Sequence, residues 1–252
     1  MERKHTHDYF LTAGECDATG HMPVQLLVSR VIEVATEHAN SLNIGYANLQ
    51  PRGIAWVLSR VSIEMDTWPG INSAYSLTTW IEGWTRFYSD RCFEVRDGEG
   101  RVIGHVRTVW VAIDIEKRSP AQLDGIANDE MVNHELTCPV AKQRKIAPVT
   151  LDTATNVMDY TFRYADLDFN RHVNSVRYVD HILNLWPLDF YDAWQLRVFE
   201  IAYVHECRFG ETVAIAAVEE PAEDGSATAR VDMLRDGART VAARLVWRKR
   251  ES

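Results

Sequence analysis

Residues 156–186 read NVMDYTFRYADLDFNRHVNSVRYVDHILNLW, and this stretch decides how the chain is organised. Its beginning, residues 156–164, alternates apolar and polar side chains, as a half-buried strand does. A polar turn with Asp168 and His172 follows. Apolar residues then recur at helical spacing and include Val176, Val179, Ile182, Leu183 and Trp186. The stretch predicts a strand, a polar turn and an amphipathic helix that ends near Pro187.

The same order of elements stands at the beginning of the chain. Residues 8–16 alternate, the turn Asp17-Ala-Thr-Gly-His21 follows, and the next apolar residues again have helical spacing: Val24, Leu27, Val28, Val31, Ala35, Ala39 and Leu42. Each predicted helix precedes four strand-like stretches, which breakers such as Pro69-Gly70 and Asp97-Gly98 separate. These stretches are residues 54–68, 74–84, 86–97 and 101–114, and then 195–207, 212–220, 226–236 and 238–248.

Four anchors align the two halves. Asp17 and His21 match Asp168 and His172 at an offset of 151, and Gly70 matches Gly210 at 140. The tripeptide at 96–98 matches the one at 235–237 at an offset of 139, and Val-Trp at 109–110 recurs at 246–247, an offset of 137. Because the anchors keep their order, we interpret the chain as a tandem duplication.

A strand, a helix and a four-stranded meander predict a curved antiparallel sheet around the helix, since the helix must bury its apolar face. We therefore predict an α+β fold, a tandem double hotdog. Residues 1–140 form the first hotdog, a polar linker lies at about 116–151, and residues 152–252 form the second hotdog.

The composition excludes several classes of protein. No apolar run reaches the roughly 18 residues of a membrane helix, and the charged start is unlike a secretory signal, so we expect a cytoplasmic protein without membrane contact. The four cysteines are far apart, which speaks against a disulfide framework or a structural zinc site. A formal charge of −9 speaks against nucleic acid as a partner.

The second polar turn is the strongest chemical signal. Asp168, Asn170, Arg171, His172 and Asn174 stand at the start of an apolar helix. A helix N-terminus offers unpaired N–H groups and a positive dipole end, which suit the negative charge that develops on a thioester oxygen. The alternative is that Asp168 or Asn170 only caps the helix.

The first copy of the turn differs in its amides. It keeps Asp17 and His21 but has Thr19 in place of Asn170 and Pro23 in place of Asn174. Such a pattern is typical of a duplicated enzyme with one degenerate site. We therefore expect the second copy to be catalytic, and a role for Asp17 and His21 stays open.

Several motifs resemble one family. Residues 168–175, DFNRHVNS, and 205–210, HECRFG, resemble the plant-type (FatA/FatB-like) acyl-acyl carrier protein thioesterases, whose motif is D-x-N-x-H-V-N-N with a downstream E-C pair. Three stretches of the first half resemble them as well: IAWVLSR at 54–60, WIEGW at 80–84 and VWVAIDIEKRS at 109–119. Ser175 departs from the motif, and the likeness is to a bacterial member.

This resemblance implies a function. The enzyme would hydrolyse fatty acyl-acyl carrier protein thioesters, release a free fatty acid and end chain elongation, without a cofactor. The first hotdog would house the acyl chain, and the second would carry a catalytic network of Asp168, Asn170, His172 and Glu206, with Cys207 beside it. Helix amides near Val173 would stabilise the oxyanion. Either Glu206 or Asp168 would act as general base on water, or as nucleophile through an anhydride.

Cys207 is the alternative nucleophile, in a Cys-His-Asn arrangement. Neighbouring residues of a regular strand point to opposite faces, so one strand cannot aim both Glu206 and Cys207 at His172. The matching strand of the first copy is more apolar at its odd positions, which places Cys207 towards the core. The resemblance favours Glu206.

Other readings remain open. A hotdog acyl-CoA thioesterase, a hydratase or dehydratase, and a non-catalytic acyl-binding protein share the fold, and the chain could be a monomer or a homodimer. His5 and His7 have no evident third ligand, so we predict no metal site. Basic residues that could receive an acidic carrier protein are Lys142, Arg144, Lys145, Arg163, Arg171 and Arg177.

Overall fold

The computed structural model describes residues 2–221 and 225–250, which form two compact units. The first unit is residues 1–142 and the second is residues 143–252. The first contains β1 (Lys4–Leu11), α1 (Val24–Ser41), α2 (Tyr46–Leu49), β2 (Ile54–Met65), β3 (Ser73–Trp84), β4 (Tyr88–Asp97), β5 (Val102–Asp114) and β6 (Ser119–Pro120). The second contains β7 (Asn156–Thr161), α3 (Ser175–Leu183), α4 (Leu188–Ala193), β8 (Trp194–Tyr203), β9 (Thr212–Pro221), β10 (Ala227–Arg235) and β11 (Ala238–Lys249).

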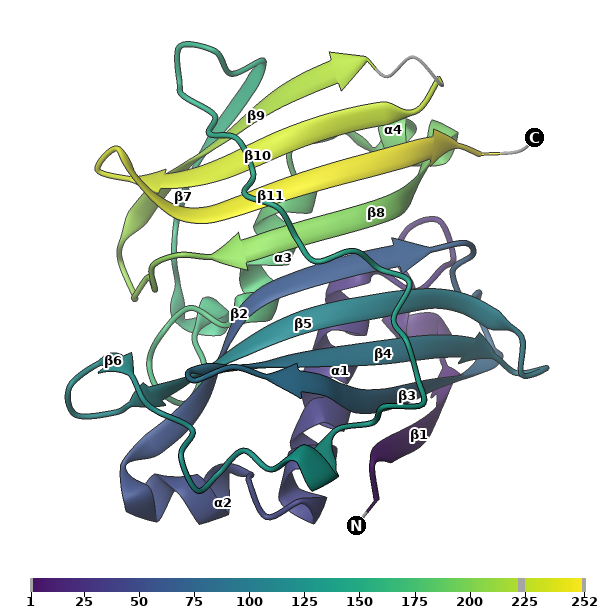
Figure 1. The fold of residues 1–252 in the computed structure, drawn as a ribbon. Coiled ribbons are helices and arrows are strands. Elements are labelled where there is room, and N and C mark those ends of the chain that lie inside the picture. Colours follow the sequence, from purple (N-terminus) through teal and green to yellow (C-terminus); the bar gives the residue numbers. More distant parts are fainter. Residues whose placement is uncertain (1, 222–224, 251–252) are drawn as a thin grey trace. The chain divides into compact units, whose positions relative to one another are not determined.

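The strands of the first unit form an antiparallel sheet in the order β2-β5-β4-β3-β1 (Figure 1). The connection from β4 to β5 is short because Asp97 Oδ1 accepts the N–H groups of Glu99 and Arg101, at 3.0 and 2.9 Å. Such a turn allows the chain to reverse directly, as a meander requires.

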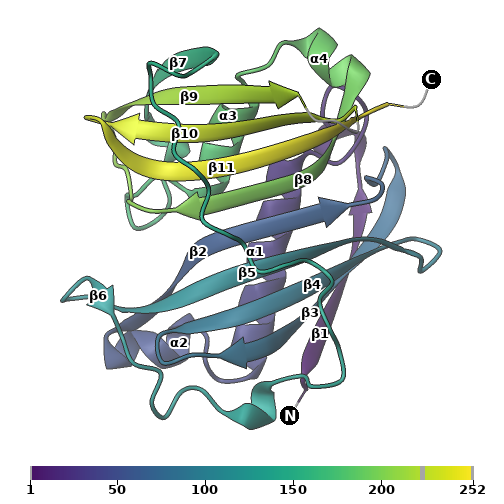
Figure 2. The ribbon, with the colours of Figure 1, turned by 45° about the horizontal axis from the view of Figure 1, so that its top comes forward.

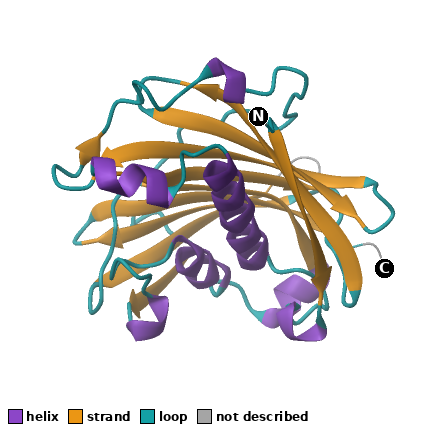
Figure 3. Ribbon diagram, turned by 90° about the horizontal axis from the view of Figure 1, so that it is seen from below, coloured by secondary structure: helices purple, strands orange, loops and turns teal. Residues whose placement is uncertain are grey.

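Helix α1 lies against this sheet (Figures 2 and 3). Its buried residues recur every three or four positions: Val24, Leu27, Val28, Val31, Val34, Ala35, His38 and Ala39. The sheet buries Val61, Leu77, Phe93 and Val106 completely. Hydrophobic burial on both elements therefore holds the helix in the curve of the sheet. Within 2–221 and 225–250, no helix has the length and hydrophobicity needed to span a bilayer.

The second unit repeats this order as β8-β11-β10-β9-β7, also antiparallel (Figure 2). Its helix α3 is shorter and buries Tyr178, Val179, His181 and Ile182. Strand, helix and four-stranded meander therefore occur twice with the same connections. The predicted α+β tandem double hotdog is confirmed.

Several predicted boundaries are wrong. In the first unit, the strand predicted at residues 8–16 is β1 at Lys4–Leu11, because Thr12 begins a short 3-10 helix, and the strand predicted at 54–68 ends at Met65. Two further boundaries differ in the second unit. The helix ends at Leu183, not near Pro187, and Pro187 instead precedes the separate helix α4. Strand β8 ends at Tyr203, not at 207. There the N–H groups of Val204 and His205 both bond to the carbonyl of Thr240, at 2.9 and 3.1 Å, which interrupts the regular ladder.

The predicted linker at about 116–151 is largely packed against the units. Leu123, Ile126, Met131 and Val132 join a buried cluster with residues that follow α1. Further along, Arg107 Nε donates to the Val140 carbonyl at 2.8 Å within the first unit. In the second unit, Arg239 donates to the carbonyls of Ile146 and Ala147 at 3.0 and 3.1 Å.

A buried carboxylate fixes the end of this connection. Asp232 is 1% exposed, accepts Arg239 Nη2 at 2.5 Å and accepts the N–H of Val149 at 3.0 Å. Removing Asp232 leaves a guanidinium and an amide without their acceptor. We predict that Asp232→Ala lowers the free energy of unfolding by about 2–3 kcal/mol, measured by urea denaturation. The control Glu200→Ala, which breaks the more exposed Glu200–Arg244 pair, should cost less than about 1 kcal/mol. Equal losses would contradict this prediction.

Helix α1 carries a buried, neutral histidine that contacts Arg91 of β4. His38 Nδ1 accepts Arg91 Nη1 at 2.8 Å, and its Nε2 donates to the Glu2 carbonyl at 3.1 Å. Burial and the charge of Arg91 lower the pKa of His38 from 6.5 to about 4. The folded protein therefore resists a proton that the unfolded chain accepts.

We predict that stability falls as the pH drops from about 6.5 to 4, because only the unfolded His38 binds a proton in that range. The loss due to this residue should reach about 3 kcal/mol, measured as unfolding free energy against pH. His38→Gln keeps an acceptor for Arg91 and should flatten the slope. If the slope is the same in His38→Gln, other groups cause it.

Candidate active site

The turn of the second unit is organised by the carboxylate of Asp168. Its Oδ1 accepts the N–H groups of Asn170 and His172 at 2.8 and 3.0 Å, and the Asp168 N–H donates to the His172 carbonyl at 2.8 Å. The cap of α3 is instead Asn174, whose side chain accepts the N–H of Val176 at 3.0 Å. The alternative that Asp168 or Asn170 caps the helix is therefore wrong, because Asp168 closes its own turn.

The turn of the first unit has the same backbone frame. Asp17 Oδ1 accepts the N–H groups of Thr19 and His21 at 2.8 and 3.2 Å, and the Asp17 N–H donates to the His21 carbonyl at 2.8 Å. Both turns need one left-handed residue, which is Gly20 (φ 77°) in the first copy and Arg171 (φ 64°) in the second. The aspartates therefore maintain backbone shape in both copies.

In the second unit the imidazole meets a carboxylate. His172 Nε2 lies 3.2 Å from Glu206 Oε1, and Arg208 Nη2 lies 3.4 Å from Glu206 Oε1 and 3.5 Å from His172 Nε2. The backbones of His172 and Arg208 form an isolated β-bridge, which holds the two segments together. The His172 and Glu206 side chains are 25% and 40% exposed, so a substrate can reach this pair from solution.

Asn170 lies at the edge of the turn. Its side chain is exposed, and its Nδ2 is 3.5 Å from Asp168 Oδ2. The amide therefore has room to turn towards a bound group.

Cys207 lies on the other side of the backbone. The residue is completely buried, and its N–H donates to the Tyr178 hydroxyl at 3.0 Å. Burial raises the pKa of the Cys207 thiol. A thiol needs to become a thiolate to act as a nucleophile, so this surrounding disfavours nucleophilic attack. Glu206 faces solvent and Cys207 faces the core, although neither residue belongs to a regular strand.

Two backbone amides at and near Val173 form hydrogen bonds within the protein. The Val173 N–H donates to the Cys207 carbonyl at 2.8 Å, and the Val176 N–H donates to Asn174. The Val173 N–H therefore joins the two segments of the turn, and a role of the other helix amides near Val173 in stabilising an oxyanion stays a prediction.

The backbone bonds also correct the internal alignment. Met22 N–H donates to Pro69 in the first unit as Val173 N–H donates to Cys207 in the second. These bonds match Pro69 with Cys207, an offset of 138 rather than the predicted 140. Trp68 therefore stands where the second copy has Glu206, and His21 Nδ1 instead bonds to the carbonyl of Thr19 at 2.9 Å. The first copy lacks the carboxylate partner.

A buried polar group supports the second turn from beneath. His181 Nε2 lies 3.1 Å from Asp166 Oδ1, and Tyr160 donates to Asp166 Oδ2 at 3.0 Å. Burial alone would raise the pKa of Asp166, but the hydrogen bonds from Arg163, His181 and Tyr160 lower it. The sequence alone does not predict this network, because Asp166 in the turn and His181 in the helix are 15 residues apart and meet only after folding.

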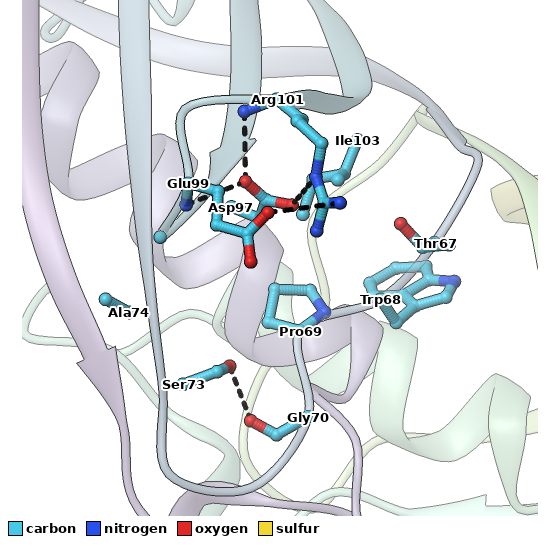
Figure 4. A pocket seen from close by; sticks show the side chains of 11 residues that line it. Thr67, Trp68, Pro69, Gly70, Ser73, Ala74, Asp97, Glu99, Arg101 and Ile103 are labelled. Carbon is cyan, nitrogen blue, oxygen red and sulfur yellow. Dashed lines mark hydrogen bonds and ion pairs between the residues drawn. The ribbon is translucent and has the colours of Figure 1, made fainter.

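A separate hollow of about 330 Å³ lies in the first unit, between the turns that end β2 and β4 (Figure 4). Asp97 and Arg101 pair there at 2.8 Å, and Ser73 donates to the Gly70 carbonyl at 2.6 Å. Its charged groups are therefore engaged with one another, and none of the predicted site residues lines it.

Two hotdog units in one chain, with a carboxylate–imidazole pair on the second, define the class of double-hotdog proteins. Residues 2–132 match the family model of the acyl-ACP thioesterase N-terminal domain, and residues 149–249 match that of the C-terminal domain. The chain belongs to the acyl-ACP thioesterase family.

Individual proteins of this family are similar to the chain over most of its length. The chain is 23% identical over 241 residues to the chloroplastic acyl-[acyl-carrier-protein] hydrolase FATB3 of Cuphea viscosissima, a match that covers 91% of this chain and 58% of that protein. The chain thus spans about three fifths of the length of this curated relative. An acyl-ACP thioesterase structure from Bacteroides thetaiotaomicron is 30% identical, with a TM-score of 0.85 and 98% of each chain covered. The 12:0-ACP thioesterase of Umbellularia californica, at 18% identity, shares the fold, with a TM-score of 0.85 over 98% of this chain and 94% of that one.

A comparison of the two turns can show whether the aspartates have a structural role or a catalytic one. We predict that Asp17→Ala and Asp168→Ala each lower the free energy of unfolding by about 1–2 kcal/mol, because each leaves two N–H groups without an acceptor. Asp17→Asn and Asp168→Asn, which keep an oxygen at that place, should cost much less. Chemical denaturation of the four variants checks this. A full loss of stability in the Asn variants would show that the negative charge, not the acceptor, is needed.

Proposed function

We propose that the chain hydrolyses fatty acyl-acyl carrier protein thioesters at the second turn, and so releases free fatty acids and ends chain elongation. The observation that supports this most directly is the contact of 3.2 Å between His172 Nε2 and Glu206 Oε1 on an exposed face. The names of the similar proteins point to the same reaction. No step of the reaction requires a cofactor.

In the proposed reaction, Glu206 is the general base. It takes a proton from water, the water oxygen attacks the thioester carbonyl carbon, and the carbon–sulfur bond breaks. Glu206 passes this proton to His172, which lies 3.2 Å away, and His172 delivers it to the leaving thiolate, so both side chains return to their starting states. Arg208 stabilises the negative charge of Glu206 before Glu206 takes the proton. Attack by Glu206 itself through an anhydride uses the same residues.

Asp168 and Asn170 have positioning and binding roles in this proposal. One Asp168 oxygen accepts two N–H groups of the turn, so Asp168 holds His172 in place and is less suited than Glu206 to be the base. Asn170 would donate its exposed amide to the thioester oxygen, in place of the Val173 amide that the backbone already uses. Cys207, buried with a raised thiol pKa, would pack behind the site.

The first unit would bind the acyl chain and carry a degenerate site, since Trp68 stands where a carboxylate would be needed. The partner would be acyl carrier protein, an acidic protein that exposed basic residues beside the turn, Arg163 and Arg171, could receive. The four cysteines of the chain are free thiols, which fits a reducing cytoplasm. A homodimer is compatible with the reaction but is not required for it.

The test is steady-state hydrolysis of a panel of acyl-carrier-protein and acyl-coenzyme A thioesters of different chain lengths. We predict that Glu206→Gln lowers kcat/KM by about 10²–10⁴-fold, as removal of a general base does. The neighbouring variant Cys207→Ala should keep most of the activity, and so should Asp17→Ala, the matched control for Asp168→Ala.

Each other outcome assigns a different function. Loss of activity in Cys207→Ala but not in Glu206→Gln would restore the cysteine nucleophile. Faster turnover of coenzyme A esters than of carrier-protein esters would make the chain an acyl-CoA thioesterase. Hydration or dehydration of the acyl chain without hydrolysis would identify a hydratase or dehydratase. Tight binding of acyl thioesters by the wild-type protein, with no turnover, would identify an acyl-binding protein.

A further inference from the structure

The first strand brings two histidines to one face. His5 and His7 are two residues apart on β1, so their side chains point the same way, and both are partly buried while Lys4, Thr6 and Asp8 are exposed. Strand β1 pairs with β3 and has α1 beside it. Both imidazoles therefore point towards the helix.

The helix supplies a third group that sequence spacing could not reveal. Glu37 Oε2 lies 2.9 Å from His5 Nε2 and 2.9 Å from His7 Nδ1. One ligand atom from each of the three residues lies within 4.8 Å of the other two, and this is the one such group of three found in the described residues. Glu37 is 30 residues after His7, on a different element.

Both imidazoles are held in place by neighbouring rings. Tyr9 stacks on His7 with ring centroids 4.3 Å apart, and His38 stacks on His5 at 6.2 Å. The Tyr9 hydroxyl in turn donates to Glu33 at 3.2 Å. Ligands whose orientation is fixed beforehand bind a metal more tightly.

The donor set selects a class of ion. Two imidazoles and one carboxylate suit zinc and similar divalent transition metals, whereas magnesium and calcium prefer oxygen donors alone. Around tetrahedral zinc, with bonds of about 2.0–2.1 Å, ligand atoms lie about 3.3 Å apart. The two distances from Glu37 Oε2, each 2.9 Å, are close to that spacing, and the two imidazole nitrogens lie within 4.8 Å of each other. The side chains are 26–36% exposed, which leaves a path for the ion and a position for water.

We propose that His5, His7 and Glu37 bind a divalent transition-metal ion, with zinc as the best fit and water as the fourth ligand. On binding, the lone pairs of His5 Nε2 and His7 Nδ1 turn to the ion, and each imidazole keeps its proton on the other ring nitrogen. The ion ties the edge strand β1 to α1 and stabilises the first unit. This site is independent of the proposed hydrolysis, because none of its residues belongs to the second unit.

The experiment uses the full chain without a polyhistidine tag, after treatment with a chelator. Co²⁺ is titrated first, because a tetrahedral cobalt site absorbs visible light, and Zn²⁺ then displaces it in competition. We expect one Zn²⁺ per chain and a rise of the melting temperature with Zn²⁺. Glu37→Gln and His5→Asn should each weaken Zn²⁺ binding by at least about 100-fold, since even the loss of an outer partner costs 10–100-fold.

The matched control is His134→Asn. His134 also faces a carboxylate, with Nε2 3.3 Å from Asp129 Oδ2, but it does not belong to the group of three. This variant should bind Zn²⁺ like the wild type. Unchanged Zn²⁺ affinity in folded Glu37→Gln, as judged by circular dichroism, would overturn the proposal. So would a wild-type protein that gives no cobalt spectrum and no stoichiometric zinc, which would leave Glu37 as a simple ionic link between β1 and α1.

Discussion

The candidate active site depends on one carboxylate oxygen that accepts two N–H groups of its own turn. Asp168 Oδ1 binds the amides of Asn170 and His172, and this fixes the path of the chain between β7 and α3. Only then does the imidazole of His172 have a defined position beside Glu206. The first unit shows that this constraint belongs to the repeated fold, since Asp17 makes the same bonds without a carboxylate to meet His21. Asp168 therefore determines the shape of the turn, and His172 and Glu206 supply the reactive groups of the candidate site.

Much of the fold follows from local patterns. The strands β3, β5 and β11 begin and end within a residue or so of the alternating stretches, and α1 covers its apolar repeat, because period and burial are recorded along the chain itself. One error occurs where a distant group decides. Strand β8 ends because the Thr240 carbonyl takes two amides at once, and nothing near residue 204 announces that partner.

The same distinction holds for side chains. Asp168 and His172 can be singled out from a short motif, because the turn that joins them is local. Which of Glu206 and Cys207 faces outwards depends on an irregular segment, where strand alternation no longer applies. Glu37 was beyond reach for a different reason: a helix and an edge strand must pack before it meets His5 and His7. The sequence therefore predicts groups that are close along the chain, but not those that tertiary packing brings together.

The left-handed residue of the turn has a further consequence. Gly20 adopts this conformation freely, whereas for Arg171 it costs roughly 1–2 kcal/mol. The two copies of the turn therefore differ in backbone strain. The copy without the carboxylate has the relaxed residue, and the copy with it tolerates strain beside a cluster of charges. After a gene duplication, each half could change its reactive side chains separately, because the backbone beneath them is self-supporting.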